Sequence, residues 1–408
     1  MKKSAYFDAV VVGAGNVGLA FILAMAKDWQ ASLTVLGRQQ KNRQPPRILL
    51  LERGPAKQAF SHLESSSISS TYSNRVSALT PKSVAFLQKL GVWSGYIESS
   101  QRFQPWAQMQ VWQAELGSTL GGANGRGGIV FKAGEAMNSS DSDALAVTLE
   151  NSVLRQGLLS AIFQDNVVSL SNKVKDLNEI REFNDLSSSS LLELTIVAGA
   201  ESLKFEKDPF LPNGLVTVGS LINDDFHCRT PLVVGADGGS DESPVRKFSG
   251  ISCIKKDYDQ VGVVATLSHE EQADPMSLTA FQRFLASGPI ALLPLDSKTS
   301  SMVWTLPTEL GRSIVTLARE NPTLFESLVA SALNHHQSDI SYLLDRILKK
   351  KEREEVNYSE SDERGQSGLP SIAPPCSLKL SPPESVQCFP LRFRHCTEYD
   401  KARVVLIG

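Results

Sequence analysis

The sequence has little of what membrane-spanning and secreted proteins need. It holds no uninterrupted apolar run of the roughly 18 residues from which a membrane-spanning helix is made. Met1 to Ser4 lead into a strand-like segment, without the long apolar stretch of a signal peptide or the Arg-rich amphipathic stretch of a mitochondrial presequence. The sequence as given therefore predicts neither a spanning helix nor a targeting segment.

Cysteine and histidine are also scarce. The five cysteines form no C-x-x-C pair and their number is odd, which favours free or buried thiols in a reducing compartment over a disulfide framework. Of the six histidines, His335 and His336 are adjacent, but no carboxylate or cysteine stands beside them at ligand spacing. We expect no metal site.

The charge balance gives no whole-chain reason to expect a polyanionic partner. Charged residues make up 21% of the chain, the net charge is −3 and the isoelectric point is about 6.1, so no nucleic-acid partner is predicted. The 408 residues are enough for two domains, and a hydrophobic content of 41% is typical of a globular protein.

The N-terminal part predicts an α/β fold. Phe7 to Val12 is a short apolar run, Gly13 interrupts it, and helix-forming residues follow from Gly18 to Lys27. Arg47 to Glu52 is a second apolar strand, and Pro231 to Ala236 is a third. Continuous apolar strands separated by a helix are typical of a parallel sheet that is buried on both faces.

The middle of the chain has a different pattern. Between Tyr258 and Leu306 three apolar segments are separated by turn residues, which favours an antiparallel sheet. Asn321 to Leu348 is predicted to be helical, and Lys349 to Ser385 is charged and then rich in serine and proline, so we expect an inserted, disordered linker there.

The strongest motif is G-x-G-x-x-G at Gly13, Gly15 and Gly18, placed after a strand and at the start of a helix. The first glycine permits a tight turn, the second lets a diphosphate approach the backbone, and the third lets the helix pack close to the strand. The helix N-terminus offers N–H groups and a partial positive charge to the phosphates. The motif in this setting predicts an adenine dinucleotide site.

Two further positions fit such a site. Glu52 ends the second apolar strand, where an acidic side chain accepts from ribose hydroxyls, although it lies farther downstream than the usual spacing of about 20 residues. Asp237 and Gly238 belong to a second glycine-bearing turn after a strand, which a simple nicotinamide-dependent dehydrogenase does not need. Read alone, Glu52 is an exposed strand end and Asp237-Gly238 is an ordinary turn.

Longer sequence blocks add a family resemblance. The blocks are Thr71–Leu79 (TYSNRVSAL), Met109–Trp112 (MQVW), Glu150–Leu154 (ENSVL), Ser243–Arg246 (SPVR), Tyr258–Gln260 (YDQ), Val263–Leu267 (VVATL), Gln282–Leu285 (QRFL), Gly288–Leu295 (GPIALLPL), Phe389–Leu391 (FPL) and Arg403–Gly408 (RVVLIG). Together with the two glycine turns they are similar to the flavin aromatic hydroxylases, and most of all to the hydroxylases that act on the aromatic ring in ubiquinone biosynthesis. The resemblance covers nearly the whole chain apart from the inserts.

The resemblance implies a fold and a cofactor site. The fold would be an FAD-binding parallel sheet of the Rossmann-like type with an antiparallel-sheet substrate domain. FAD would be the cofactor, and no catalytic acid–base residue is implied, because the protein supplies binding, orientation and a dry pocket. Trp304 and Phe284 are candidates to face that pocket, with core packing as the favoured role of each. The implied FAD-binding residues are Gly13, Gly15, Gly18, Glu52, Arg75, Asn151, Asp237 and Gly238.

It also implies a division into alternating segments. FAD-binding segments would be 1–108, 151–250 and 388–408, substrate-domain segments 109–150 and 251–348, and a linker 349–387. The substrate would be a polyprenylated hydroxybenzoate. Electrons would come from ferredoxin and ferredoxin reductase, within a ubiquinone biosynthetic complex peripheral to the matrix face of the mitochondrial inner membrane.

The chain departs from the family pattern in two places. Four residues separate Gly238 from Ser243 where the family has two, which is expected to shift Arg246 relative to the cofactor. Family members also continue beyond the strand that ends at Gly408, so we expect a C-terminally truncated chain. The alternative function is then a non-catalytic isoform that acts as a binding partner, and retained flavin distinguishes the two; a dehydrogenase is the third alternative.

Overall fold

A computed structural model describes most of the chain. The described residues are 5–36, 44–54, 71–113, 128–134, 144–164, 168–170, 175–176, 192–200, 203–207, 216–220, 227–238, 242–271, 278–349, 374–382 and 385–407. The glycine-rich stretch from Gly121 to Gly128 lies almost wholly outside them, as does most of the predicted linker.

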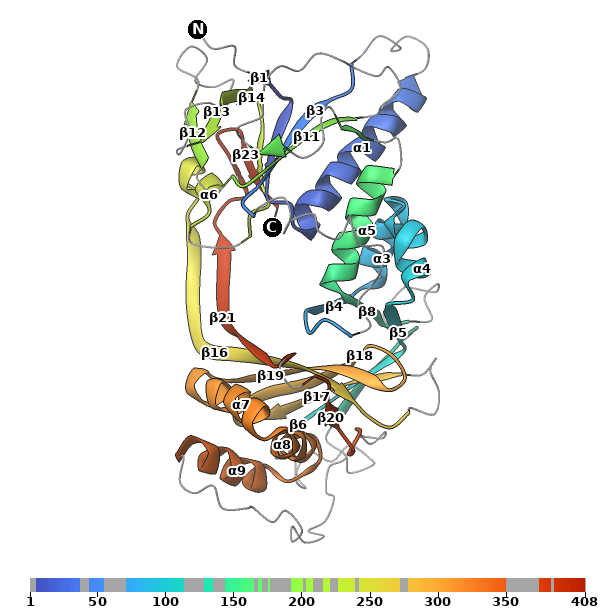
Figure 1. Cartoon of the computed structure of the whole chain (residues 1–408), viewed down its shortest axis with the longest axis vertical. Helices are drawn as coiled ribbons and strands as arrows, with labels where there is room; N and C mark the ends of the chain where they lie inside the picture. The colour runs from blue at the N-terminus through green and yellow to red at the C-terminus, as the bar shows by residue number, and fades with distance from the viewer. Residues whose placement is uncertain are drawn as a thin grey trace.

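The first half of the architecture is a parallel sheet (Figure 1). Its central strands contain almost only buried apolar residues, and alternate residues point to opposite faces, where separate apolar cores cover them. This explains why the sequence shows continuous apolar runs there, and it confirms the predicted parallel sheet. In order across the sheet the strands are β10 (Lys175–Asp176), β11 (Leu192–Ala198), β3 (Arg47–Glu52), β2 (Ala9–Val12), β15 (Val233–Gly235), β23 (Val404–Leu406) and β22 (Asp400–Lys401), with β9 (Val168–Leu170) paired to β11.

Helices cover one face of this sheet and a small sheet covers the other. The helical face carries α1 (Asn16–Leu36), α3 (Pro81–Lys89), η3 (Trp93–Ile97), α4 (Glu98–Ser100) and α5 (Asn151–Gln164). The opposite face carries α6 (Pro244–Ser249) and the four strands β1 (Ala5–Tyr6), β14 (His227–Thr230), β13 (Val216–Ser220) and β12 (Leu203–Lys207).

The second half is a mainly antiparallel sheet with helices on its far side (Figure 1). The apolar core between this sheet and its helices contains the inward residues of every long strand. The strands are β20 (Lys379–Leu380), β16 (Cys253–Ser268), β19 (Thr299–Pro307), β18 (Gly288–Pro294), β17 (Thr279–Leu285), β6 (Gln108–Gln113) and β7 (Gly128–Lys132), with β21 (Gln387–Cys396) paired to β16. The helices are α7 (Thr308–Glu320), α8 (Pro322–Asn334) and α9 (Gln337–Lys349).

Two structures connect the halves. Strands β16 and β21 run side by side from one sheet to the other as an antiparallel ribbon whose middle residues are exposed (Figure 1). A three-stranded sheet of β4 (Val76–Leu79), β8 (Ala146–Glu150) and β5 (Phe103–Trp106) lies between the helices of the first half and the strands of the second.

The prediction that Asn321 to Leu348 is helical is confirmed, with one interruption of the helical segment. The structure breaks it at His335, whose backbone is extended, into α8 and α9. At this break the buried Arg283 of β17 donates to the carbonyl oxygens of Ala332 at 3.0 Å and His335 at 2.6 Å, and so satisfies two carbonyl groups at the C-terminal end of α8.

Part of the segment predicted as a linker is an ordered piece of the antiparallel sheet. Residues 374–382 are described, and β20 within them pairs with the end of β16. Leu378 and Leu380 are buried in the same core as that sheet. Among the described residues, no helix is long and apolar enough to cross a membrane.

Candidate functional site

The turn from Gly13 to Gly15, here called the glycine corner, lies at the carboxyl end of the parallel sheet. The chain leaves β2 at Val12, turns through Gly13 to Gly15 and enters α1 at Asn16, as the motif predicts. Gly13 has a φ of +107°, and a Cβ there would lie 2.3 Å from the carbonyl oxygen of Ala236. A Cβ at Gly18 would lie 2.1 Å from the carbonyl oxygen of Gly13. Both glycines are therefore required by the close approach of neighbouring backbone.

Gly15 differs from its two neighbours in the motif. No atom of the described residues lies within 4 Å of the position that a Cβ at Gly15 would take, and the φ of Gly15 is not in the left-handed region. The fold itself therefore does not require a glycine at this position. The open space next to the first turn of α1 is the place where a diphosphate can approach backbone N–H groups.

The second glycine turn lies directly against the first. Strand β15 is parallel to β2, with Gly235 opposite Val12, and the N–H of Ala236 donates to the carbonyl oxygen of Val12 at 2.8 Å. Asp237 and Gly238 follow at once, Gly238 with a φ of +76°. Segments more than two hundred residues apart in the chain are thus joined at one corner.

Asp237 carries an unsatisfied oxygen at this corner. Its Oδ1 accepts from the hydroxyl of Ser243 at 3.1 Å, while its Oδ2 is buried with no hydrogen-bond partner among the described residues. Burial raises the pKa of the Asp237 carboxyl group, against the lowering effects of Ser243 and of the charges of Arg53 and Arg246. An orphaned buried oxygen of this kind fits a group that supplies a hydrogen-bond donor when it binds.

Glu52 also reaches the glycine corner, from the end of β3. Its Oε2 accepts from the N–H of Ala14 at 2.7 Å, and its Oε1 accepts from the N–H of Gly54 at 3.0 Å. The carboxylate therefore holds the glycine turn in place. A carboxylate accepts about four hydrogen bonds, so acceptor capacity remains for hydroxyl groups.

Asn151 starts α5 and lies beside the start of α1. Its Oδ1 accepts from the hydroxyl of Ser77 at 2.7 Å, and its carbonyl oxygen is 3.5 Å from Nδ2 of Asn16. Its N–H donates to the carbonyl oxygen of Arg75 at 3.0 Å. Asn151 therefore connects the loop that carries Arg75 to the helix whose N-terminus forms the glycine corner.

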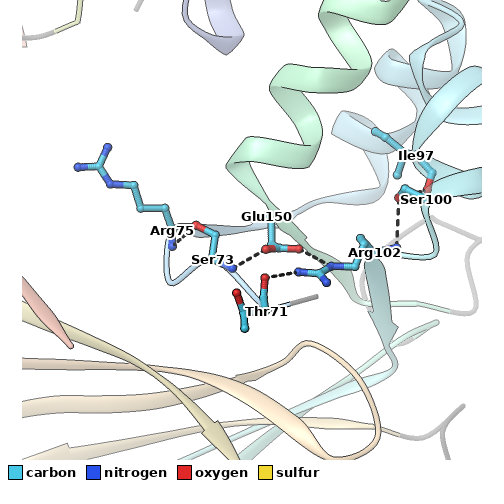
Figure 2. Close-up of polar contacts among 7 residues, drawn as sticks. All are labelled: Thr71, Ser73, Arg75, Ile97, Ser100, Arg102 and Glu150. Atoms are coloured by element: carbon cyan, nitrogen blue, oxygen red, sulfur yellow. Dashed lines mark hydrogen bonds and ion pairs between the residues drawn. The ribbon is translucent and has the colours of Figure 1, made fainter. Parts of the chain in front are cut away.

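Arg75 projects from this loop toward strand β21. Its side chain is exposed, and the guanidinium carbon lies 4.8 Å from the ring centroid of Phe389 in β21. Figure 2 shows the side chain pointing away from the buried contacts that hold the loop. An exposed cation in this position is available to an anionic ligand between the two halves.

A buried ion pair that the sequence did not reveal holds the same loop (Figure 2). Glu150 is 2% exposed, and its Oε2 lies 2.7 Å from Nε of Arg102. Its Oε1 accepts from the N–H of Ser73 at 2.5 Å, while Arg102 donates to the carbonyl oxygen of Thr71 at 3.1 Å and lies over the ring of Tyr72, 3.9 Å from its centroid. The pair thus contacts three residues of the 71–75 loop.

Tyr72 extends these contacts to the second half of the molecule. Its hydroxyl is hydrogen-bonded to the carboxylate of Asp296, in the turn between β18 and β19. The pKa of Tyr72 is raised well above its ordinary range, mainly by burial and secondly by this carboxylate. Glu150 had one signal in the sequence, an acidic residue in an otherwise apolar strand. Arg102 and Asp296 had none.

The face of the antiparallel sheet opposite its helices carries small apolar and hydroxyl side chains. Val264, Val303 and Ala291 are cross-strand neighbours on this face, and Thr305 lies beside Gly262. Trp304 points to the other face and is fully buried in the core, as predicted. Core packing was the wrong expectation for Phe284, which is 42% exposed at the end of β17.

Replacing Glu52 tests its hold on the glycine corner. Glu52→Ala leaves the buried N–H of Ala14 without an acceptor, so we expect the free energy of unfolding to fall by about 2 kcal/mol in urea denaturation. Glu206→Ala, which removes a half-exposed partner of Lys204, should change it by less than about 0.5 kcal/mol. Equal stability of Glu52→Ala and the wild type would contradict the assignment.

A double-mutant cycle tests the buried pair. Arg102→Met and Glu150→Gln should each lower the free energy of unfolding by about 3 kcal/mol, because each leaves the other charge of the pair without its partner. In the double variant the free energy of unfolding should fall by at least about 1 kcal/mol less than the sum of the two single losses. The exposed pair Glu398 and Lys401 serves as control, with an expected coupling below about 0.5 kcal/mol. Additive losses at the buried pair would show that it contributes no coupling.

Asp237→Asn tests the buried carboxyl group. A raised pKa means that the folded chain binds the proton more tightly than the unfolded chain, so stability falls as pH rises from the ordinary value of 3.8 through the raised pKa. In urea denaturation without ligand, the free energy of unfolding of the variant should therefore exceed that of the wild type by about 1 kcal/mol or less at pH 7.5, and by a smaller amount at pH 4. Asp28→Asn, on the exposed side of α1, should give no gain. A loss of stability in Asp237→Asn at both pH values would contradict the account.

Comparisons with known proteins agree with this architecture. No family model matches the sequence. The fold is similar to PqsL of Pseudomonas aeruginosa, a probable FAD-dependent monooxygenase, with a TM-score of 0.52 and 13% identity over 99% of this chain and 78% of that one. It is also similar to the flavin-dependent monooxygenase PieE in complex with FAD and substrate, with a TM-score of 0.51 and 13% identity over 99% of this chain and 52% of that one. At these identities the likeness establishes the fold, which is the one expected.

Sequence relatives are closer. The chain is 29% identical to the mitochondrial ubiquinone biosynthesis monooxygenase COQ6 of Xenopus tropicalis over 411 residues, which is 99% of this chain and 72% of that protein. It is 30% identical to the protein of the same name from Mus musculus over 407 residues, which is 98% of this chain and 69% of that protein. Aligned over nearly its whole length with such relatives, the chain belongs to the COQ6 family of ubiquinone biosynthesis monooxygenases.

Proposed function

We propose that this chain is an FAD-dependent monooxygenase that hydroxylates the aromatic ring of a polyprenylated hydroxybenzoate precursor in ubiquinone biosynthesis. The proposal rests on the glycine corner of a COQ6-family chain. Within the part of the chain that the structure describes, no atom lies within 4 Å of a Cβ at Gly15, and the buried Oδ2 of Asp237 has no hydrogen-bond partner. A dehydrogenase needs neither this second turn nor the antiparallel sheet.

The residues at the corner fit the diphosphate and ribose of FAD. Gly13 and Gly18 bring the backbone close together, and Gly15 leaves room for the diphosphate beside the positive end of α1, a helix of 21 residues. Glu52 retains acceptor capacity for ribose hydroxyls while it holds the N–H of Ala14. In the proposed site Asp237 and the adjacent Gly238 would contact the cofactor at the second turn.

Arg75 and Asn151 would contact the cofactor where the two halves face each other. Arg75 is the exposed cation on the 71–75 loop, and the buried pair of Arg102 and Glu150 fixes that loop. Asn151 links the loop to the start of α1 through its backbone N–H, which donates to Arg75, and its carbonyl oxygen, which accepts from Asn16. Preorganised contacts of this kind lower the entropy lost on binding.

When bound, FAD supplies the redox chemistry that activates dioxygen for transfer of one oxygen atom to an electron-rich ring. The antiparallel sheet would cover the reacting groups and exclude water, because its face toward the first half carries small and apolar side chains such as Ala291, Val264 and Val303. No acid or base of the protein is required in this scheme, and the catalytic residues remain unassigned.

We assign the chain segments accordingly. The FAD-binding domain comprises 1–108, 151–250 and 388–408, and the substrate domain comprises 109–150 and 251–348. Most strands support this division, because β2, β3, β15 and β23 share the parallel sheet and β6 pairs with β17 in the antiparallel sheet. Strand β21, which lies almost wholly within 388–408, departs from it, because it pairs with β16 of the antiparallel sheet.

The setting of the reaction is also proposed from the relatives. Their names place them in mitochondria. We propose that this chain works on the matrix side of the inner membrane, peripherally attached and within a ubiquinone biosynthetic complex. A ferredoxin and its reductase would supply the electrons.

The proposal is tested by loading the purified chain with FAD and supplying a ferredoxin, its reductase, a prenylated 4-hydroxybenzoate and isotopically labelled dioxygen. We expect a ring-hydroxylated product that carries one labelled oxygen atom, detected by mass spectrometry. A chain that retains stoichiometric FAD but forms no hydroxylated product would contradict the proposed reaction. A chain that retains no FAD would favour the non-catalytic alternative.

Gly15→Val is the matched variant for this assay. Because no atom of residues placed in the structure lies within 4 Å of a Cβ at Gly15, the substitution should leave the unfolding temperature of the ligand-free chain nearly unchanged. It should weaken FAD binding at least about tenfold, equivalent to about 1.4 kcal/mol, by occupying the diphosphate position, and abolish product at limiting FAD. Gly13→Ala, which collides with Ala236, should destabilise the fold instead. Normal FAD affinity in Gly15→Val would place the cofactor elsewhere.

A further inference from the structure

Two cysteines face each other where the β16–β21 ribbon leaves the parallel-sheet half. Cys253 begins β16, Cys396 ends β21, and the two are direct cross-strand partners 143 positions apart in the chain. Their sulfur atoms lie 2.7 Å apart, and both residues are present as free cysteines. Direct partners in an antiparallel pair have Cα atoms about 4.5–5.5 Å apart, within the range of about 4.4–6.8 Å that disulfides span.

The surroundings of the pair favour a reactive thiolate. Arg246 of α6 hydrogen-bonds to the Cys253 thiol, and the positive charge of Lys255 lies nearby. Burial raises the pKa of the Cys253 thiol, but the contacts with Cys396 and Arg246 lower it more, so that the pKa lies below its ordinary value. The pKa of the Cys396 thiol is raised by burial and by Cys253. A thiol with a lowered pKa that lies beside a cation and a second cysteine is typical of redox-active sites.

Solvent access distinguishes this pair from Cys228. Both members are half-buried, and the next residues along both strands are largely exposed. Cys228 is fully buried and burial raises its pKa to about 12. Cys376 is exposed and Cys388 is half-buried.

We propose that Cys253 and Cys396 form a reversible disulfide and that the oxidant is a low-molecular-weight disulfide of the glutathione type. The site is separate from the proposed FAD contacts, although Arg246 also acts electrostatically on Asp237. The cross-link would tie β16 to β21 at the end of the ribbon nearest α6.

The chemistry balances as two thiol–disulfide exchanges. The Cys253 thiolate attacks one sulfur of glutathione disulfide, forming a mixed disulfide and releasing one glutathione thiolate, which takes up the proton that Cys253 lost. The Cys396 thiolate then attacks the sulfur of Cys253 and expels the second glutathione, which takes up the proton of Cys396. Two protein thiols are oxidised to one disulfide, and one glutathione disulfide is reduced to two glutathiones.

The test uses the full chain without added FAD, so its outcome is independent of the proposed function. The protein is equilibrated anaerobically with a series of glutathione to glutathione disulfide ratios, acid-quenched, alkylated and mapped by mass spectrometry. We expect a Cys253–Cys396 disulfide that increases with glutathione disulfide and is reversed by dithiothreitol, while Cys228 stays a thiol. The exposed Cys376 serves as a control. It should form a mixed disulfide with glutathione, which would show that the oxidant reaches exposed thiols.

If Cys253 and Cys396 remain thiols, or each carries a glutathione, at a ratio that modifies Cys376, the proposal is overturned. Cys396→Ser should trap the mixed disulfide at Cys253, whereas a Cys388→Ser control should leave the cross-link unchanged. Arg246→Gln should slow the alkylation of Cys253 by about threefold or more, and Arg246→Lys should slow it less, because the lysine retains the charge. Equal rates in the wild type and both variants would show that Arg246 does not activate the thiol.

Discussion

The arrangement of this molecule depends on one close approach of backbone to backbone. Strand β15 lies parallel to β2, and the turn after it packs directly on Gly13, where a Cβ would lie 2.3 Å from the carbonyl oxygen of Ala236. A side chain at Gly13 would force the two turns apart. Because they stay together, the motif near the N-terminus and Asp237, far downstream, form one corner at the start of α1.

The other candidate residues are positioned by contacts that lead away from this corner. Glu52 connects the glycine turn to the end of β3, and Asn151 connects the start of α1 to the loop that carries Arg75. The buried pair of Arg102 and Glu150 then fixes that loop, and Tyr72 extends the contacts to Asp296 in the antiparallel sheet. Hydrogen bonds, an ion pair and the cation–π contact of Arg102 with Tyr72 therefore join the proposed cofactor site to the antiparallel sheet that would cover the substrate.

Local patterns in the sequence predicted the parts of this architecture that depend on neighbouring residues. The turn at Gly13 and the helix after it follow from glycine spacing beside an apolar strand, and the buried strands follow from runs such as Arg47–Glu52. Contacts between distant segments left no such pattern. Arg102 gives no sign in the sequence that it pairs with Glu150, and Cys253 gives none that it faces Cys396. The interruption of the helical segment at His335 was not predicted for the same reason, because Arg283, which hydrogen-bonds to the end of α8, lies about fifty residues away in β17.

The central claim is that a dinucleotide diphosphate binds at the open side of Gly15. A crystal structure of the chain grown with FAD tests this most directly. The account predicts density for the diphosphate within hydrogen-bonding distance of the backbone N–H groups at the start of α1, with the side chain of Glu52 at the adenosine ribose. Flavin density at any other place on the chain, with the corner at Gly15 left unoccupied, would contradict it.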